Sequence, residues 1–413
     1  MSGELNRSRS LSDARAEHCQ AVRCVSSYSV GDALSRCTAW RQTAVPIVST
    51  SALSRNPYSF PVRQDWLDRR KEPILEPDLP IVDPHHHLWD RPGWRYLLDE
   101  LLADTNSGHN ILATVFVQAF AMMRAGGPVE MRPVGETEFV NGIAAMSASG
   151  IYGKTRHCAG IVGHADLTLG SRVEPVLAAH IRAGGDRLRG IRYSTVWDAD
   201  PSIRYPAYSP PPGLLGDRRF REGFAVLGRL GLSFDAWLYH PQIDEVGDLA
   251  RAFPQVKVAL DHVGGPIGIG AYAGKHSEVF PGWAVSIKAL AACPNVYVKL
   301  GGLGMRLGGF GFYEHPEPPS SETLASTWRP YIETCINAFS PKRCMFESNF
   351  PVDKGSYSYP VFWNACKLLA KGASDSEKAD LFWGTAARFY RLDLSDRCRS
   401  DGARPSISLT TPM

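Results

Sequence analysis

Eight short runs of β-branched and apolar residues alternate with amphipathic stretches along most of this chain, and this alternation constrains the fold more than any other feature. The apolar periodicity predicts helices between the runs, at residues 136–147, 173–183, 218–230, 243–253 and 324–338. Eight β/α units over about 310 residues predict a (β/α)8 TIM barrel of the α/β class. The predicted strands are residues 80–83, 111–118, 158–164, 188–193, 232–239, 256–261, 296–300 and 343–347.

A doubly wound open sheet is the alternative for a chain that alternates in this way. Such a sheet carries a glycine-rich turn after its first strand. Here the first strand leads instead into Asp-Pro-His-His-His at residues 83–87. We therefore predict the barrel, in which catalytic residues lie at the C-terminal ends of the strands.

The three histidines after the first predicted strand indicate a metal site. Residues i and i+2 of a strand share a face, so His85 and His87 point one way and His86 points the other way. Two imidazoles on one face can bind one divalent ion. A surface cluster that binds nothing is the alternative, but the apolar lead-in and the single spacer residue favour a site.

Polar residues also follow the other predicted strands. They gather at the strand ends where a barrel carries its site, whereas ordinary surface polarity would be scattered. In order from the second to the eighth strand they are Gln118, His164 with Asp166, Arg192 with Tyr193, Tyr239 with His240, Asp261 with His262, Lys299, and Glu347 with Asn349.

Four of these elements together resemble a known family. They are His-x-His after the first strand, His240 after the fifth, His262 in Leu-Asp-His-Val-Gly-Gly-Pro after the sixth, and Cys-Met-Phe-Glu-Ser-Asn-Phe-Pro-Val after the eighth. In this order they resemble the amidohydrolase superfamily over about residues 60–393. The nearest subgroup is the amidohydrolase-related proteins, which include metal-dependent lactonases and pyrone-dicarboxylate lactonase. Decarboxylases of the aminocarboxymuconate type are a second neighbour.

The resemblance implies roles for individual residues. His85 and His87 match the paired metal ligands of the family, and His240 matches its ligand after the fifth strand. His262 matches a histidine that binds metal or contacts substrate in relatives. The last family motif reads Gly-Ser-Asp-x-Pro, and its Asp binds metal and handles the proton of the attacking water. Here that position is Asn349, whose amide oxygen can bind metal but cannot accept a proton near neutral pH.

Glu347 is the first candidate for the base in place of that Asp. It lies two residues before Asn349, so it shares the inward face one layer deeper. A carboxylate buried there needs a metal, a cation or hydrogen bonds to compensate its charge. A structural Glu347 paired with Lys299 or Arg192 is the alternative.

Two further residues are candidates for the same role. Asp353 is one, although its place beyond Pro351 leads us to expect it to face solvent. His262 is the other, because the ordinary pKa of histidine lies near neutrality. A histidine that caps a loop through Asp261 is the alternative reading of His262.

Arg192, Tyr239 and Gln118 are predicted to contact the substrate. An arginine at the barrel rim suits a carboxylate or a developing oxyanion, and a salt bridge to an acid such as Asp198 is its alternative. The glycine-rich and aromatic segment 301–327 has a length that commonly covers a site, with an oligomer contact as the alternative.

Composition limits the partners that we expect. A net charge of +3 over 413 residues gives no reason to expect nucleic acid or an anionic membrane. Nine dispersed cysteines without a Cys-x-x-Cys pair indicate reduced thiols in the cytoplasm. Residues 1–56 lack apolar periodicity and are predicted to be a disordered extension, 57–394 the barrel, and 395–413 a disordered tail.

The preferred hypothesis is a hydrolase that opens a lactone of a small, carboxylated substrate with one divalent metal ion, Zn or alternatively Mn. A metal-dependent decarboxylase is the second hypothesis, since it needs no strong base and tolerates Asn349. A ligand-binding barrel without catalysis is the third; self-association stays open. The hypothesis assigns metal binding to His85, His87 and His240, catalysis to His262, Glu347 and Asn349, and substrate binding to Arg192, Tyr239 and Gln118.

Overall fold

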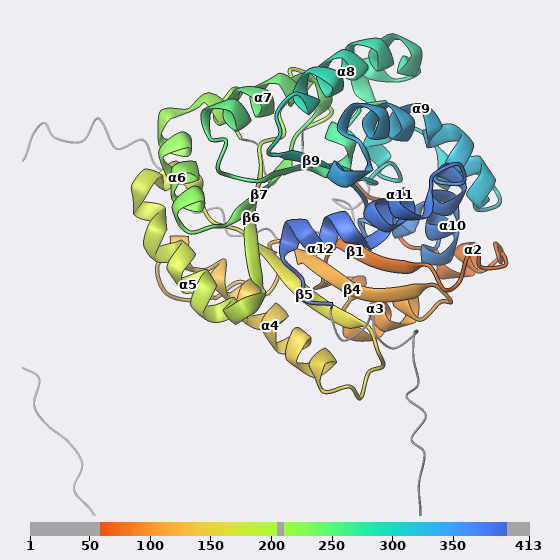
Figure 1. Cartoon of the computed structure of the whole chain (residues 1–413), viewed down its shortest axis with the longest axis horizontal. Helices are drawn as coiled ribbons and strands as arrows, with labels where there is room; N and C mark the ends of the chain where they lie inside the picture. Colours follow the sequence, from red (N-terminus) through yellow and green to blue (C-terminus); the bar gives the residue numbers. More distant parts are fainter. Residues whose placement is uncertain (1–57, 205–209, 395–413) are drawn as a thin grey trace, which may run out of the picture. The chain divides into compact units, whose positions relative to one another are not determined.

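The computed structural model describes residues 58–204 and 210–394. Its eight main strands are parallel and neighbour one another in chain order (Figure 1). The predictions for residues 1–56 and 395–413 lie outside the described residues, so the domain limits stay predictions. The strands are β1 (Pro80–His86), β4 (Asn110–Val117), β5 (Arg156–Gly163), β6 (Leu188–Ser194), β7 (Ser233–Trp237), β8 (Val258–Leu260), β9 (Val296–Leu300) and β10 (Cys344–Phe346).

The end of β1 and the chain just after β10 close the ring. His86 forms a parallel bridge with Phe350, and the His87 amide donates to the Phe350 carbonyl at 2.8 Å. The backbone N–H of Asn349 donates to the His85 carbonyl at 3.0 Å. The barrel predicted from the sequence is therefore confirmed, and its closure brings His85, His87 and Asn349 to one rim.

Helices cover the outside of the barrel in Figure 1. The amphipathic stretches of the sequence form α4, α5, α6, α7 and α9. Phe224 of α6 packs edge to face on Phe234 of β7, with ring centroids 5.1 Å apart. The helices are α2 (Gln64–Leu67), α3 (Leu98–Thr105), α4 (Val134–Ala148), α5 (Glu174–Gly184), α6 (Arg218–Arg229), α7 (Ile243–Ala252), α8 (His276–Ala291), α9 (Ser321–Phe339), α10 (Tyr359–Leu369), α11 (Asp375–Ala379) and α12 (Thr385–Tyr390), and β2 (Trp89–Arg91) pairs with β3 (Trp94–Tyr96) in a hairpin.

The interior of the barrel is layered, because alternate residues of each strand point inward. Val82 of β1 and Met345 of β10 belong to an apolar floor that also contains Phe389 and Tyr390 of α12. Toward the C-terminal ends, buried charged side chains lie on β6, β7 and β9 and just after β8 and β10: Arg192, Asp235, Lys299, Asp261 and Glu347. The N-terminal end of the barrel interior is therefore apolar, and the polar groups lie toward the C-terminal rim.

The segment that precedes β1 lies against the loop after β9. Phe60 stacks on Tyr313 with ring centroids 4.4 Å apart, and Arg63 donates to the Tyr313 carbonyl at 2.7 Å. The hydroxyls of Tyr58 and Tyr239 are 3.1 Å apart. Residues from before the first strand therefore reach the C-terminal rim.

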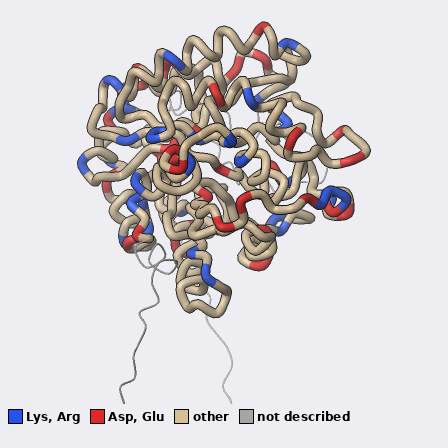
Figure 2. The backbone as a smooth tube through the Cα atoms, turned by 45° about the vertical axis from the view of Figure 1, so that its right-hand side comes forward, with Lys and Arg blue, Asp and Glu red and all other residues tan. Residues whose placement is uncertain are grey.

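Charges on the outside are mixed in sign. Figure 2 shows basic and acidic residues interspersed along the backbone. Within residues 58–204 and 210–394, no helix has the length and apolar character that crossing a bilayer demands. The five cysteines that the structure describes are free and buried: Cys158, Cys293, Cys335, Cys344 and Cys366.

Candidate active site

Buried charges fill the inward positions above the apolar floor. Lys299 of β9 donates to Asp235 of β7 at 2.7 Å and lies 3.1 Å from a carboxylate oxygen of Asp261. Arg192 of β6 lies 3.8 Å from the other oxygen of Asp261. Burial alone would lower the pKa of Lys299, but the carboxylates around it together raise the pKa. Buried ions cost several kcal/mol each unless they are paired, so such a layer must compensate itself closely.

Glu347 holds two imidazoles at the upper edge of this layer. Its Oε1 accepts from the His262 amide at 3.0 Å and from His262 Nδ1 at 2.7 Å, and its Oε2 lies 2.7 Å from His85 Nδ1. Burial raises the pKa of Glu347 to about 8, against the lowering effect of Lys299. The sequence alternative, a structural pair with Lys299, is the longer contact at 4.0 Å. Glu347 therefore orients the Nδ1 side of His262. The Nδ1 atom of His85 lies between Glu347 Oε2 at 2.7 Å and Lys299 Nζ at 3.0 Å.

His87 and Asn349 present lone pairs to each other. His87 Nδ1 lies 2.7 Å from the Val117 carbonyl, which only accepts, so Nδ1 carries the proton. Burial keeps the pKa of His87 well below its ordinary value, so Nε2 is bare. The Asn349 Nδ2 donates to Asp353 at 2.8 Å, which turns its Oδ1 toward His87 Nε2 at 3.3 Å. Two lone pairs that face each other repel, and a cation bound between them would remove this repulsion.

The donor set fits a divalent ion. Two ligands about 2.1 Å from a tetrahedral zinc ion are about 3.4 Å apart, and His87 Nε2 and Asn349 Oδ1 are 3.3 Å apart. His85, His262 and Glu347 offer ligand atoms within 4.8 Å of one another. Apart from the close approach of His85 Nδ1, Glu347 Oε2 meets no hydrogen-bond donor in the described part of the chain, so a bound cation would supply its partner.

Arg192 occupies the space beside the other candidate ligand nitrogen. Its Nη1 lies 3.3 Å from His85 Nε2, and its Nη2 donates to the Gln118 carbonyl. A metal ion at His85 Nε2 therefore requires the guanidinium to move. The carboxylate next to Arg192 is Asp261 and not Asp198, whose Oδ2 accepts instead from Tyr272 at 2.9 Å.

His262 lies on a strained turn after β8. The sequence predicts a strand over 256–261, but β8 ends at Leu260 because His262 and Val263 adopt left-handed backbone, with φ of 56° and 48°. Such conformations cost on the order of 1–3 kcal/mol outside glycine and occur most at functional sites. Burial lowers the pKa of His262 to about 3, so its ring is neutral. The Trp237 ring packs against it at 4.7 Å.

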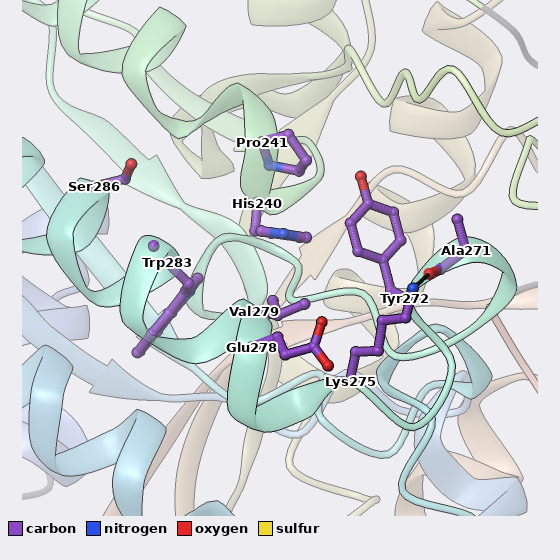
Figure 3. Close-up of a pocket in the computed structure, with 10 residues that line it drawn as sticks. His240, Pro241, Ala271, Tyr272, Lys275, Glu278, Val279, Trp283 and Ser286 are labelled. Carbon is purple, nitrogen blue, oxygen red and sulfur yellow. Dashed lines mark hydrogen bonds between the residues drawn. The ribbon is translucent and has the colours of Figure 1, made fainter.

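The structure separates His240 from this cluster. Its Nδ1 accepts from the Ile267 amide at 3.3 Å, and its ring lies 5.3 Å from that of Tyr272. Both rings line a cavity of about 500 Å³ beside α8. Figure 3 shows these two rings among the residues that line it. Among the described residues, no hydrogen bond, ion pair or ring contact joins His240 to His85 or His87. The role of His240 as a metal ligand stays a prediction. Its neighbours in the structure are Ile267 and Tyr272, whereas the sequence implies His85 and His87.

Gln118 and Tyr239 are buried at the rim. The Oε1 atom of Gln118 is buried and has no hydrogen-bond partner among residues 58–204 and 210–394. The Tyr239 hydroxyl donates to the Ile203 carbonyl at 3.2 Å and meets Tyr58, which places it behind the rim surface. Tyr58 and Trp237 were missed in the sequence. Nothing before the first strand marks Tyr58, whereas Trp237 lies two residues before Tyr239 in the predicted strand 232–239 and could have been found there.

Asp353 is fully buried, and the expectation that it faces solvent is wrong. The chain turns back after Pro351, so the Asp353 carboxylate lies behind Asn349 and accepts from the Tyr357 hydroxyl at 2.6 Å. Burial raises the pKa of Asp353 to about 7, although its hydrogen bonds act to lower it. The sequence does not reveal this return of the chain.

Comparison with known proteins places this chain in a family. The amidohydrolase family model matches residues 82–392, and the chain belongs to that family. It is 34% identical to the protein y4mH of Sinorhizobium fredii over 76% of this chain and 99% of that protein. It is 27% identical to the L-fucono-1,5-lactonase of Burkholderia multivorans over 75% of this chain and 96% of that enzyme. The family resemblance seen in the sequence is thereby confirmed.

Solved structures agree with the fold. An amidohydrolase from Burkholderia multivorans with bound zinc has a TM-score of 0.57 and 26% identity, over 76% of this chain and 99% of that chain. A putative 2-pyrone-4,6-dicarboxylic acid hydrolase from Pseudomonas putida has a TM-score of 0.51 and 19% identity, over 76% and 99% of the two chains, which supports the barrel alone. The chain is therefore a member of a hydrolase family whose relatives include a zinc-bound protein.

Proposed function

We propose that this protein hydrolyses a lactone that carries a carboxylate, with one divalent ion at the barrel rim. The observation that supports this most is the hydrogen-bonded pair of Glu347 and His262 beside the facing lone pairs of His87 and Asn349. The relative named as an L-fucono-1,5-lactonase supports the choice of a cyclic ester.

The ion is proposed to be Zn, or alternatively Mn, and to lie at His87 and Asn349 with His85 next to them. When bound, it would polarise the lactone carbonyl and acidify water. The other ligand role assigned from the sequence, that of His240, would need a rearrangement of its turn. We also propose that the protein acts in the cytoplasm on a small-molecule substrate. The proposal makes no assignment of oligomeric state.

His262 and Glu347 are proposed to move the proton. Water attacks the carbonyl carbon, and its proton passes to Nε2 of His262. Glu347 accepts the Nδ1–H bond at 2.7 Å and stabilises the charge that the ring gains. The ring C–O bond then breaks, and the leaving alkoxide takes the proton back, which gives the open hydroxy acid. In this scheme Asn349 needs no basicity, because the base lies just after β8.

The reaction class is tested by the products formed from six-membered lactones, with and without a carboxylate, in the presence of Zn or Mn salts. Proton release and a ring-opened hydroxy acid would support the proposal. Carbon dioxide from a carboxylated ring that stays closed would replace it with the decarboxylase. Saturable binding without either product would replace it with the ligand-binding barrel.

Arg192 is expected to hold the substrate carboxylate. Charge-assisted hydrogen bonds are worth about 1.5–3 kcal/mol, so Arg192→Gln should raise KM for a carboxylated lactone about 10- to 100-fold. The matched control is a neutral lactone of the same ring size, whose KM should change far less. Steady-state kinetics on both substrates would decide, and equal changes would contradict the role.

Gly302 gives His262 the room that the proposed mechanism requires. A Cβ at this position would lie 2.4 Å from His262 Cγ, on backbone with φ of 69°. We expect Gly302→Ala to displace the ring and to lower kcat by about 10²-fold, the scale of a misplacement of about 1 Å. Gly231→Ala is the matched control, because Gly231 has φ of 64° and nothing within 4 Å of its Cβ position. Similar kcat values for the two folded variants would argue against the idea.

A further inference from the structure

Asp353 lies behind Asn349, on the side of the amide that faces away from His87. Both side chains are buried. The Asp353 Oδ1 accepts from Asn349 Nδ2 at 2.8 Å, and its Oδ2 accepts from the Gly304 amide at 3.0 Å and the Tyr357 hydroxyl at 2.6 Å. Three donors, two from the surrounding stretch 349–357 and one from the loop after β9, therefore fix this carboxylate in place.

The Asn349 amide has two orientations that fill the same space. One presents oxygen to His87, and the other presents the NH2 group. The Oδ2 atom of Asp353 already accepts from Gly304 and Tyr357, and its Oδ1 accepts from the Asn349 NH2 group, which therefore faces Asp353. Turned over, the NH2 group would donate to Nε2 of His87 and would occupy the lone pair that the ion needs.

We propose that Asp353 is a positioning residue that turns the Asn349 oxygen toward His87 and so creates a pair of neutral ligands for the divalent ion. This inference rests on the proposed function, because it assigns the ion to that pair. The carboxylate acts on the site through the amide, with Asn349 between it and His87.

Asp353→Asn tests the orientation without a change of size. The backbone amide of Gly304 must still find an acceptor, so the new side-chain amide would turn its oxygen to Gly304 and its NH2 group to Asn349. The Asn349 amide would then turn over and donate to His87. We expect zinc affinity, measured by competition with a chromogenic chelator, to fall about 10- to 100-fold, the usual effect of changing a residue that supports a ligand.

The double variant Asp353→Asn/Asn349→Asp is the rescue. A carboxylate at position 349 accepts from the NH2 group at position 353 and presents its other oxygen to His87, so zinc affinity should return to near the wild-type value. Tyr357→Phe is the matched control, because it removes a hydrogen bond of Asp353 on the oxygen that does not touch Asn349. This variant should bind zinc like the wild type.

Circular dichroism and thermal unfolding establish that each variant is folded. Wild-type zinc affinity in a folded Asp353→Asn variant, or a folded double variant that does not regain zinc, would overturn the inference. Nitrogen NMR of histidine-labelled, zinc-free protein separates it from the proposed function. The His87 Nε2 signal is assigned by its loss in His87→Ala. It should report a bare nitrogen in the wild type and a hydrogen bond from the Asn349 NH2 group in Asp353→Asn.

The two measurements together leave distinct outcomes. A changed Nε2 signal in Asp353→Asn supports the positioning role even if the wild type binds no zinc, and then the metal part of the proposed function fails alone. An unchanged Nε2 signal in a folded Asp353→Asn variant overturns the positioning role whatever the zinc affinity.

Discussion

Replacing Glu347 by Gln is expected to lower kcat for lactone hydrolysis by about 10²- to 10⁴-fold, the range that a positioned acid–base group supplies. The amide is nearly the same size and still offers an oxygen to the His262 amide and to Nδ1. It carries no charge, however, so it does not stabilise the imidazolium that forms when His262 takes a proton. Stopped-flow or steady-state rates of ring opening measure the loss.

Glu136→Gln is the matched control for that variant. Glu136 is also buried, and its pKa is raised to about 7 by burial, but its Oε1 accepts from the amides of Ala119 and Ala121 at 2.8 and 2.9 Å. A glutamine oxygen can accept both bonds, so activity should change little. If Glu347→Gln kept the rate of this control, the proton would have to move through another group.

Replacing His87 by Ala is expected to remove the divalent ion and with it the hydrolytic activity. The substitution deletes Nε2, one of the two lone pairs that face each other at 3.3 Å, and leaves Asn349 as a single weak ligand. Zinc affinity should fall more than about 100-fold, beyond the usual effect of changing a supporting residue. Elemental analysis after dialysis, beside chelator competition, measures the loss.

His86→Ala makes a similar cavity on the other side of the same strand. His86 is fully buried, and its Nε2 lies 2.8 Å from the Thr114 hydroxyl and 3.9 Å from Cys158 Sγ. This variant should lose thermal stability and keep its zinc. Full zinc content and activity in a folded His87→Ala protein would contradict the assignment of the ion to His87 and Asn349.

The period of two along a strand made part of this site predictable. It placed His85 and His87 together and His86 opposite, and the structure shows His86 among Thr114 and Cys158. It also placed Glu347 inward. The eighth strand could be read in this way because each inward residue is two positions from the next, and short-range periodicity survives in any barrel.

Other parts depend on contacts that no local pattern carries. Its place beyond Pro351 leads us to expect Asp353 in solvent, yet the return of the chain buries it behind Asn349. The site's carboxylate partners were equally hidden, since Lys299 meets Asp235 across 64 positions of sequence. Such pairings form only when the barrel closes. Closure decides which strands are neighbours, but which inward side chains then meet depends on the residues of all the strands together.

The segment before β1 has a practical consequence for anyone who expresses this protein. The family match begins at residue 82, which invites a fragment that starts there. Such a fragment would lack Phe60 and so uncover the face of Tyr313, and it would lack Tyr58 beside the Tyr239 hydroxyl. Freshly exposed aromatic surface promotes association between molecules. A shortened protein that begins before Tyr58 is therefore the better choice for crystals and for assays.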